Sequence, residues 1–557
     1  FEGAGMTVKA RRGRIFGAEL KDVVAVLPDF ETDNVLTVHG SAHGPSQDFL
    51  RFIAESPVAE SINHFTDPFR VEGRGSLDLQ LVLPLHKLAD SRVKGEYQFT
   101  RNRLQVDPAL PPFTEASGRV GFTESQLTVK NGVAKVFGDA LSVAGGSRPD
   151  GSVVLNAQGS LSVVALRQAL DLPLLDHLSG SAAWKGAVTV PKKGGVEFAL
   201  DSNLQGVVSS LPDPLNKSSA ASLPFRFEIE VPPGAGGVSG DVIRLFAGSI
   251  FSAQFQRSHE GGRTRVTRGG LALGEPVRLA DKGVQVSARA DSLDADAWRK
   301  ALAGNPERHA GEGAAAAKAA DDEAFPISSV ALRTGELRML GQRLTDVSLR
   351  AVMEEGGWQA KVTSKEASGD VVWRDQGRGR LQARFRHLAL GSAGTEGAAD
   401  TARPDEERLS ELPGLDVTAD SFVLRGHALG RLELKAANRG ESWRLEHLGI
   451  ASPDGALSGS GVWRPGVKEE TRLNFKLDVS SVEKMLARLG YPEAVRRGKG
   501  VLEGELAWHG PPTALHIPSL GGKMSVQVES GQFAQLDPGV GRLLGVLSLQ
   551  ALPRRIT

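Results

Sequence analysis

The feature that most constrains this chain is a regular alternation of apolar and polar residues, clearest in residues 471–511. There Leu473, Phe475 and Leu477 share one parity and polar residues take the other, which is the period of a strand with one buried face. Ser481 then offers an N-cap for a short segment whose apolar residues have helical spacing. Glycines and a second alternating segment follow. The pattern predicts a unit of strand, short helix, glycine hinge and strand.

The same unit recurs in looser form at residues 48–83 and 163–190. In the first of these copies Leu77, Leu79 and Leu81 alternate with other residues after a pair of glycines. Most of the remaining chain consists of short alternating segments separated by Gly, Asn or Pro, as expected of strands joined by turns. Helices are therefore expected at only a few places: residues 48–62, 163–178, 294–302 and 480–490.

These segments predict a mainly β fold. Phe225, Phe227 and Ile229 form another alternating strand, and charged residues occupy its opposite parity. No regular succession of helices and fully apolar strands occurs, which argues against an α/β enzyme core. Strands of one polarity pattern over hundreds of residues indicate a long, largely antiparallel sheet with one apolar face. The expected helices are too few to cover all of that face.

Two stretches interrupt the pattern, residues 304–324 and 391–407, and both are rich in Ala, Gly and charged residues. Such compositions bury too little apolar surface to order themselves, so we expect mobile linkers or loops there. The expected organisation is a first β region, a flexible linker, a continuing β region, a flexible loop and a C-terminal β region: residues 1–303, 304–324, 325–390, 391–412 and 413–557.

Composition narrows the function. The 66 basic and 66 acidic residues cancel, which leaves no electrostatic argument for nucleic acid as a partner. The sequence has no cysteine, so it has no Cys-based metal or redox site, and it suits an oxidising compartment. No run of about 18 apolar residues predicts a membrane-spanning helix. Because the chain starts at Phe1 and stops at Thr557 in a strand-like segment, we expect an internal fragment of a longer protein.

Three short motifs have a functional interpretation and a plainer alternative. Ser481 and Lys484 fit the Ser-x-x-Lys pattern of β-lactamases, but the partner motifs are lacking and Ser481 stands at an N-cap position. His39 and His43 are four residues apart, but neighbouring glycines disfavour a helix, so we interpret them as solvated loop histidines. The basic pair at 554–555 could meet a lipid phosphate or remain solvated. No catalytic residue, metal site or cofactor is predicted.

Several segments resemble one protein family. They are LPDPLNK at residues 211–217, LGYPEA at 489–494, GVLEGELAW at 500–508, GQF at 531–533 and GRLLGVLSLQALPRR at 541–555. Together with the organisation of nearly the whole chain, these segments are similar to the YhdP branch of the AsmA-like proteins, which are bridge-like lipid transfer proteins.

The resemblance implies a long curved sheet of the β-taco type, an open groove with an apolar concave face and a few short helices. It also implies a periplasmic location within a Gram-negative envelope protein anchored in the inner membrane. The implied activity is conduction of phospholipid between inner and outer membrane, without enzymatic chemistry. Contact with either membrane, and any envelope protein partner, would then involve segments outside this sequence.

The apolar stripes are the candidate site. Exposing a lipid tail of about a dozen methylenes to water costs on the order of 10 kcal/mol, which a continuous apolar trough avoids. An alternative is that these residues pack under a helix or a second sheet. A non-transporting envelope scaffold that acts through protein partners is the second functional hypothesis. The residues expected to line the groove are Leu77, Leu79, Leu81, Phe225, Phe227, Ile229, Leu473, Phe475 and Leu477.

Overall fold

The fold comes from a computed structural model, which forms two compact units: Phe1–Ser287 with Ala297–Pro326, and Ala288–Asp296 with Ile327–Thr557. The structure describes residues 5–533 except 31–33, 56–65, 68, 88–89, 107–110, 171, 193–194, 234–238, 261–262, 303–326, 355, 376–378, 392–411, 441, 466–468, 493–494, 513–515 and 531. The expected linker at 304–324 and most of the expected loop at 391–412 therefore lie outside the described residues.

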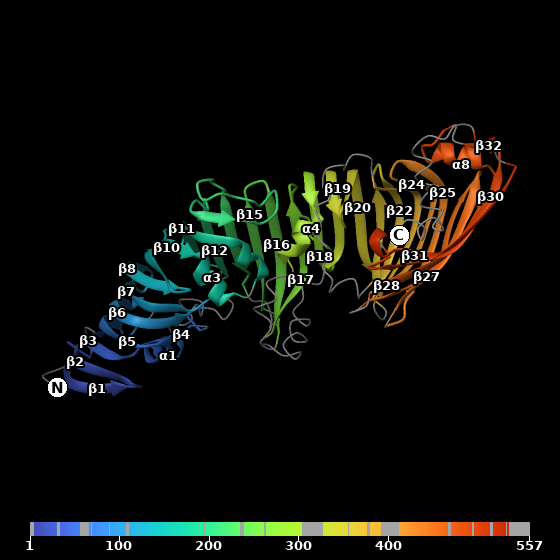
Figure 1. The fold of residues 1–557 in the computed structure, drawn as a ribbon. Helices are drawn as coiled ribbons and strands as arrows, with labels where there is room; N and C mark the ends of the chain where they lie inside the picture. The colour runs from blue at the N-terminus through green and yellow to red at the C-terminus, as the bar shows by residue number, and fades with distance from the viewer. Residues whose placement is uncertain are drawn as a thin grey trace. The chain divides into compact units, whose positions relative to one another are not determined.

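The first unit is built on an open sheet (Figure 1). Its strands are β1 (Met6–Ile15), β2 (Ala18–Leu27), β3 (Val35–Pro45), β4 (Arg70–Glu72), β5 (Arg74–Pro84), β6 (Arg92–Gln105), β7 (Phe113–Thr123), β8 (Leu127–Val136), β9 (Asp139–Ser147), β10 (Val153–Ser162), β11 (Leu178–Val190), β12 (Val196–Ser202), β13 (Val207–Ser209), β14 (Phe225–Val231), β15 (Ser239–Ala247), β16 (Phe251–Glu260) and β17 (Arg263–Leu273). A further strand, β18 (Gly283–Asp294), contributes residues to both units.

Successive strands of the first unit pair antiparallel from β1 to β17, with β4 beside β6 and β13 beside β11 as short additional partners. This order follows the sequence because short turns can join only neighbouring antiparallel strands. The mainly β, largely antiparallel fold predicted from the alternation is confirmed.

The second unit has the same plan. Its strands are β19 (Ile327–Met339), β20 (Gln342–Glu354), β21 (Gly357–Thr363), β22 (Ala367–Arg374), β23 (Arg380–Leu390), β24 (Gly414–Leu424), β25 (His427–Asn438), β26 (Trp443–Ser452), β27 (Gly455–Arg464), β28 (Glu470–Val479), β30 (Lys499–His509) and β31 (Gly521–Glu529). A separate small sheet pairs β29 (Val495–Arg496) with β32 (Gln532–Phe533).

One pair in the second unit departs from the antiparallel plan, because β23 and β24 run parallel. A parallel pair cannot be closed by a tight turn and needs a crossover of about a dozen residues or more. Residues 391–413 form this connection, which is the stretch whose composition interrupts the alternation. This low-complexity stretch therefore joins two neighbouring strands that run in the same direction, which the alternation alone does not reveal.

Among the described residues the helices are few and short: α1 (Ser46–Ala54), α3 (Val163–Ala169), α4 (Ala295–Leu302) and α8 (Val482–Arg488), with 3₁₀ turns η2 (Pro173–His177) and η3 (Ile517–Ser519). The continuous helix expected at 163–178 is wrong. Leu170 is extended, and Leu172 is extended because the ring of Pro173 disfavours helical geometry in the residue before it. Part of the helix expected at 48–62 lies outside the described residues.

Within the described residues, buried side chains form four small hydrophobic clusters. One cluster, for example, contains only Val163, Ala182 and Val207 as buried members. A single sheet layer buries a side chain only where a helix, a loop or the curl of the sheet lies against it, so the clusters are local. Most of the apolar face is consequently half-buried.

Candidate functional site

The predicted groove residues of the first unit share one face of its sheet. One row of cross-strand neighbours runs Leu77, Tyr97, Val120, Val129, Gly145, Leu155, Val188, Phe198 and Ile229. Residues directly opposite in a ladder point to the same side, and so do residues two apart along a strand. Leu77, Leu79 and Leu81 therefore lie on the same side as Phe225, Phe227 and Ile229, and we call this side the first apolar face.

The predicted residues of the second unit form a comparable surface. A row across its sheet runs Phe385, Ala419, Leu432, Ile450, Leu457, Leu477, Leu502 and Val526. Leu473 and Phe475 share the parity of Leu477 on β28, so all three belong to this side, the second apolar face. The structure thus brings the nine predicted residues together as two surfaces, one in each unit.

The nine predicted groove residues are for the most part neither fully buried nor fully exposed. Eight of the nine are half-buried, and Ile229 is 8% exposed. Val526 and Val528, at the far end of the second apolar face, are 53% and 61% exposed. Apolar side chains that stay partly open over many strands give each unit a contiguous apolar surface, which in a folded protein usually marks a ligand or partner.

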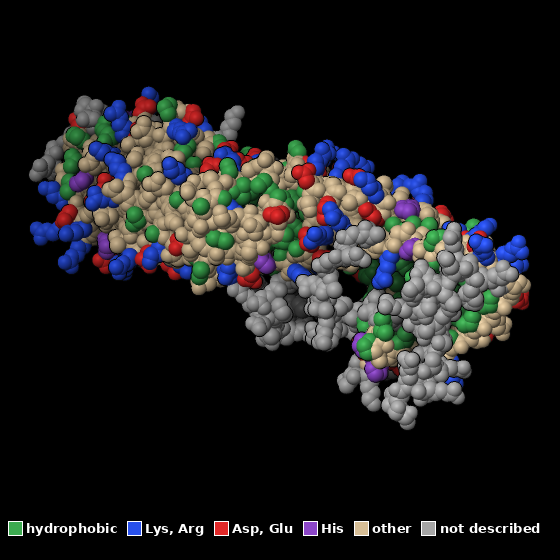
Figure 2. All heavy atoms as spheres, turned by 45° about the horizontal axis from the view of Figure 1, so that its top comes forward, with side chains coloured by type: hydrophobic (Ala, Val, Ile, Leu, Met, Phe, Trp, Pro, Cys, Tyr) green, Lys and Arg blue, Asp and Glu red, His purple; other side chains and the backbone are tan. Residues whose placement is uncertain are grey.

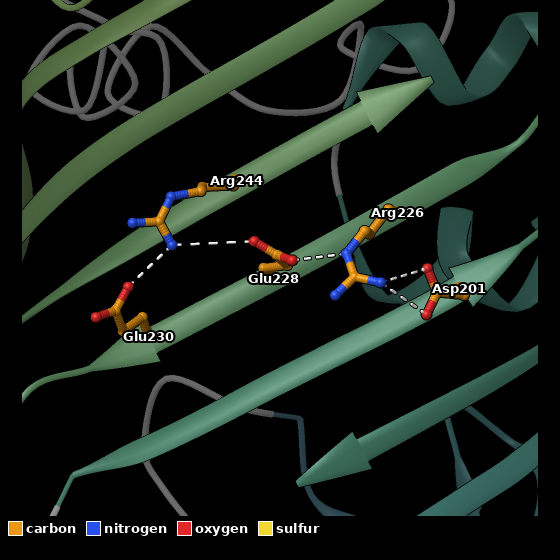
Figure 3. A network of polar contacts seen from close by, with 5 residues as sticks. All are labelled: Asp201, Arg226, Glu228, Glu230 and Arg244. Atoms are coloured by element: carbon orange, nitrogen blue, oxygen red, sulfur yellow. Dashed lines mark hydrogen bonds and ion pairs between the residues drawn. The ribbon is translucent and has the colours of Figure 1, made fainter. Parts of the chain in front are cut away.

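On the opposite face of the first unit, ion pairs link neighbouring strands (Figure 3). Arg226 joins Asp201 on β12, with Nη1 3.0 Å from Oδ1, and Glu228 on its own strand, with Nε 2.6 Å from Oε1. Arg244 on β15 binds Glu230 at 2.9 Å. A one-residue register slip of β14 would carry these charges onto the apolar face, so the network opposes that slip.

Basic and acidic side chains are mixed over the face that Figure 2 shows, in keeping with the zero net charge. A hollow of about 1090 Å³ in the first unit is lined by Lys185, Asp201 and Arg226, among other residues. Its charged side chains belong to the face opposite the apolar one. Phe225, one of the predicted groove residues, also lines this hollow, so the hollow is not separate from the candidate site.

Helices lie at one edge of the first sheet. An even number of antiparallel steps separates β3 from β10, so both strands end at the same edge, where α1 and α3 follow. Ser46 of α1 accepts hydrogen bonds at Oγ from Tyr97 Oη at 2.7 Å and from Asn102 Nδ2 at 2.6 Å. The rings of Phe49 and Tyr97 stand 5.1 Å apart. The helix thus covers part of the first apolar face.

The paired glycines noticed in the sequence have a steric role here. Gly73 has a φ of +126°, and a Cβ on it would collide with the side chain of Asn102. A Cβ on Gly75 would collide with the ring and hydroxyl of Tyr97. Both positions must remain glycine for α1 to sit against β6. Burial of the Tyr97 hydroxyl in this junction raises its pKa, against a smaller lowering by the hydrogen bond to Ser46.

A buried lysine organises the loop beside α3. Lys217 is 8% exposed, and its Nζ donates to the carbonyl oxygens of Leu204 and Val207 at 2.7 Å each and of Ser218 at 3.1 Å. Burial lowers the pKa of Lys217. The three carbonyls satisfy the three ammonium donors. The LPDPLNK segment therefore ends in a lysine that ties the start of β13 to the residues just before it and to the loop after it.

Helix α8 occupies the matching edge of the second unit. Ser481 caps it by accepting from Lys484 N at 3.4 Å, as predicted, so the Ser-x-x-Lys pair here lies at a helix start. Arg488 forms an ion pair with Asp454 in the β26–β27 turn, and its carbonyl lies 3.1 Å from His427 Nδ1. The helix is fixed to hairpin turns at the rim of the sheet.

Three tryptophans lie near the other edge of the sheet in the second unit. Trp443, Trp463 and Trp508 lie in one cross-strand row and are 7%, 1% and 5% exposed. Their indole N–H groups donate to Pro413 O, Glu469 Oε1 and Pro511 O. Each ring thus packs on the apolar face while its polar end is satisfied at the sheet edge.

The histidine motif is placed differently from the expectation. His39 and His43 lie on β3, not in a loop, and both point to the face opposite the apolar one. Four residues along a strand separate them by about 13 Å, too far to bind one metal ion together. No cluster of three or more potential metal ligands occurs in the part of the chain that the structure describes. The basic pair at 554–555 lies outside that part.

One polar group on the first apolar face was not anticipated. Asp241 on β15 and Arg257 and His259 on β16 share the parity of apolar neighbours such as Ile243 and Phe255. Arg257 donates to both carboxylate oxygens of Asp241, with Nε–Oδ1 of 2.8 Å and Nη2–Oδ2 of 2.6 Å. In the sequence each of these residues interrupts the alternation, and only the pairing of β15 with β16 brings them together.

Comparison with known proteins identifies the family. A family model described as YhdP protein matches residues 1–557. Neither the curated proteins nor the solved structures contain a match. Within the described residues, no helix has the length and apolarity that crossing a membrane requires. The match covers the entire sequence and agrees with the long series of one-sided strands, so the chain belongs to the YhdP protein family.

Proposed function

We propose that this chain conducts phospholipid between the inner and outer membranes of a Gram-negative envelope, with its two apolar faces as the surface for the acyl chains. Membership of the YhdP family supports an envelope protein related to lipid transport. The observation that carries the proposal is the largely half-buried state of the apolar rows. They cross the main sheet from β5 to β14 in the first unit, β13 excepted, and from β23 to β31 in the second, β29 excepted.

The energetics favour such a surface. Each methylene that leaves water gains about 0.8 kcal/mol, so a sheet face that accepts a tail along its whole length removes a barrier on the order of 10 kcal/mol. Conduction also requires that no single position bind too tightly. A row of aliphatic and aromatic side chains meets this requirement, because dispersion contacts are weak individually and similar from one strand to the next. The proposed activity needs no catalytic group.

Site-specific photocrosslinking tests the proposal with a control built into the same strands. We expect a photoreactive phenylalanine analogue at Phe227 or Phe475 to yield covalent phospholipid adducts in cells, detected by mass spectrometry. The same analogue at Arg226 or Lys476, one residue away on the opposite face, should yield none.

Equal labelling on both faces, or no lipid adduct at either apolar position, would reject the proposal. Protein adducts at Phe227 and Phe475 in place of lipid would instead favour the scaffold hypothesis. A polar substitution such as Phe475→Asn should impair lipid passage if the face conducts lipid, and should be tolerated if the protein acts as a scaffold.

A further inference from the structure

The first apolar face changes character along strands β15, β16 and β17. Three successive rows are apolar: Ala247 with Phe251 and Leu273, Leu245 with Ala253 and Leu271, and Ile243 with Phe255 and Gly269. The next rows bring Asp241 opposite Arg257, and then His259 opposite Thr264. Asp241 and Arg257 thus place a carboxylate and a guanidinium directly opposite each other at the end of these apolar rows.

The geometry of this group orients one edge of the guanidinium. The Asp241 side chain is 1% exposed, and its carboxylate accepts hydrogen bonds from Nε and Nη2 of Arg257. His259 Nε2 lies 3.1 Å from the second oxygen of Asp241, and His259 Nδ1 lies 2.9 Å from Thr264 Oγ1. Arg257 is 20% exposed, and its Nη1 has no hydrogen-bond partner among the described residues. That free edge is the one a phosphate can approach with paired hydrogen bonds.

The length of the apolar rows fits one acyl chain. From Asp241 to Ala247 the strand advances about 20 Å at 3.4 Å per residue. The hydrocarbon layer of one bilayer leaflet is about 15 Å thick. A chain lying along β15 and β16 therefore stays on apolar side chains from its end to its glycerol, and its polar group reaches Arg257.

We propose that Arg257, held by Asp241, contacts the phosphate of a glycerophospholipid whose acyl chains lie on Ile243, Leu245 and Phe255. This proposal rests on the proposed function and adds to it a place where the headgroup is read. The charge pattern selects the occupant, because an apolar stripe that ends at an oriented cation complements an anionic amphiphile and gives a neutral one no added contact. Asp241 keeps Arg257 in place but also opposes the phosphate charge.

The test compares two lipids that differ by the phosphate. The full chain is titrated with fluorescent phosphatidylglycerol and with fluorescent diacylglycerol of the same chain length. We expect Arg257→Met to weaken phosphatidylglycerol binding about tenfold, the loss of one charge-assisted contact, and to leave diacylglycerol binding unchanged. Asp241→Asn removes the opposing charge, so this variant should bind phosphatidylglycerol at least as tightly as the wild type.

The two substitutions in this ion pair should affect phosphatidylglycerol affinity differently, and this difference distinguishes the proposal from a purely structural role of the pair. If the pair only stabilises the sheet, both variants weaken both lipids together, and the proposal fails. Arg226→Met, on the opposite face of β14, is the matched control and should change neither affinity. Thermal unfolding of each variant shows whether the fold survives, and Arg257→Lys, which keeps the charge, should bind phosphatidylglycerol more tightly than Arg257→Met does.

Two further outcomes have distinct meanings. If glycerol phosphate alone competes as well as the lipid does, the group is a site for free anions and the proposal is overturned. If neither lipid binds the wild type, the proposed function fails first. If both lipids bind equally and Arg257→Met changes nothing, the apolar face still conducts lipid but Arg257 does not read the headgroup.

Discussion

Helices α1 and α8 occupy equivalent places, each in the connection between two antiparallel neighbours at a sheet edge, yet different forces hold them. The start of α1 is fixed by neutral hydrogen bonds, with Ser46 and Asn102 3% and 2% exposed. The end of α8 is fixed by the ion pair of Arg488 with Asp454 at the rim, where the Arg488 side chain is 32% exposed. The comparison shows that one strand–helix–strand pattern tolerates two anchoring chemistries.

The largest effect is expected at α1. Asn102→Ala removes one of the two hydrogen bonds at Ser46 Oγ and leaves the backbone N–H of Arg74 without its side-chain acceptor in a buried place, so it should destabilise the junction by about 2–3 kcal/mol. Amide hydrogen exchange over residues 46–54 measures this directly. Asn474→Ala, on the exposed side of β28, serves as the control and should change exchange by little. Unaltered protection of α1 in Asn102→Ala would contradict the assignment of Asn102 as its anchor.

A smaller loss is expected at α8. Arg488→Met leaves the carboxylate of Asp454 unpaired. That carboxylate is only 8% exposed, but it lies in a hairpin turn at the rim, where water can replace the 32% exposed Arg488 side chain, so we expect a penalty of about 1–2 kcal/mol. Exchange over residues 482–488 should rise accordingly, and added salt should weaken α8 in the wild type while α1 is unaffected. Arg439→Met removes a pair with Glu446 whose side chains are 65% and 43% exposed, and it should be nearly neutral. Equal salt sensitivity of the two helices would remove the distinction between them.

The smallest effect concerns pH. The pKa of Tyr97 is raised in the folded state, chiefly by burial, so its contribution to stability is complete below the ordinary value of 10.0 and is lost as pH rises through the higher folded value. Absorbance titration of tyrosinate should show one of the two tyrosines ionising late. Tyr97→Phe should remove that late step and the alkaline weakening of α1. If the late step persists in Tyr97→Phe, it belongs to Tyr491 and the assignment is wrong.

The candidate site was predictable to the extent that it follows from parity. Leu77, Phe227 and Phe475 each stand in a strand whose alternation assigns a face without knowledge of the partners. The Asp241–Arg257 pair was not predictable in this way, because a charged residue in an apolar parity looks like a break in the pattern until its partner is known. Only pairing of β15 with β16 brings the two side chains together.

The sequence by itself determined that the chain forms many one-sided strands with a few short helices, because a side-chain period of two is a local property of extended backbone. It also determined the apolar identity of each face. Tertiary structure decided the register, the parallel pairing of β23 with β24 and the tryptophan edge, since each depends on contacts between residues distant along the chain. Local alternation predicts which side chains lie on the apolar face, and only the assembled sheet determines which side chains of other strands they contact.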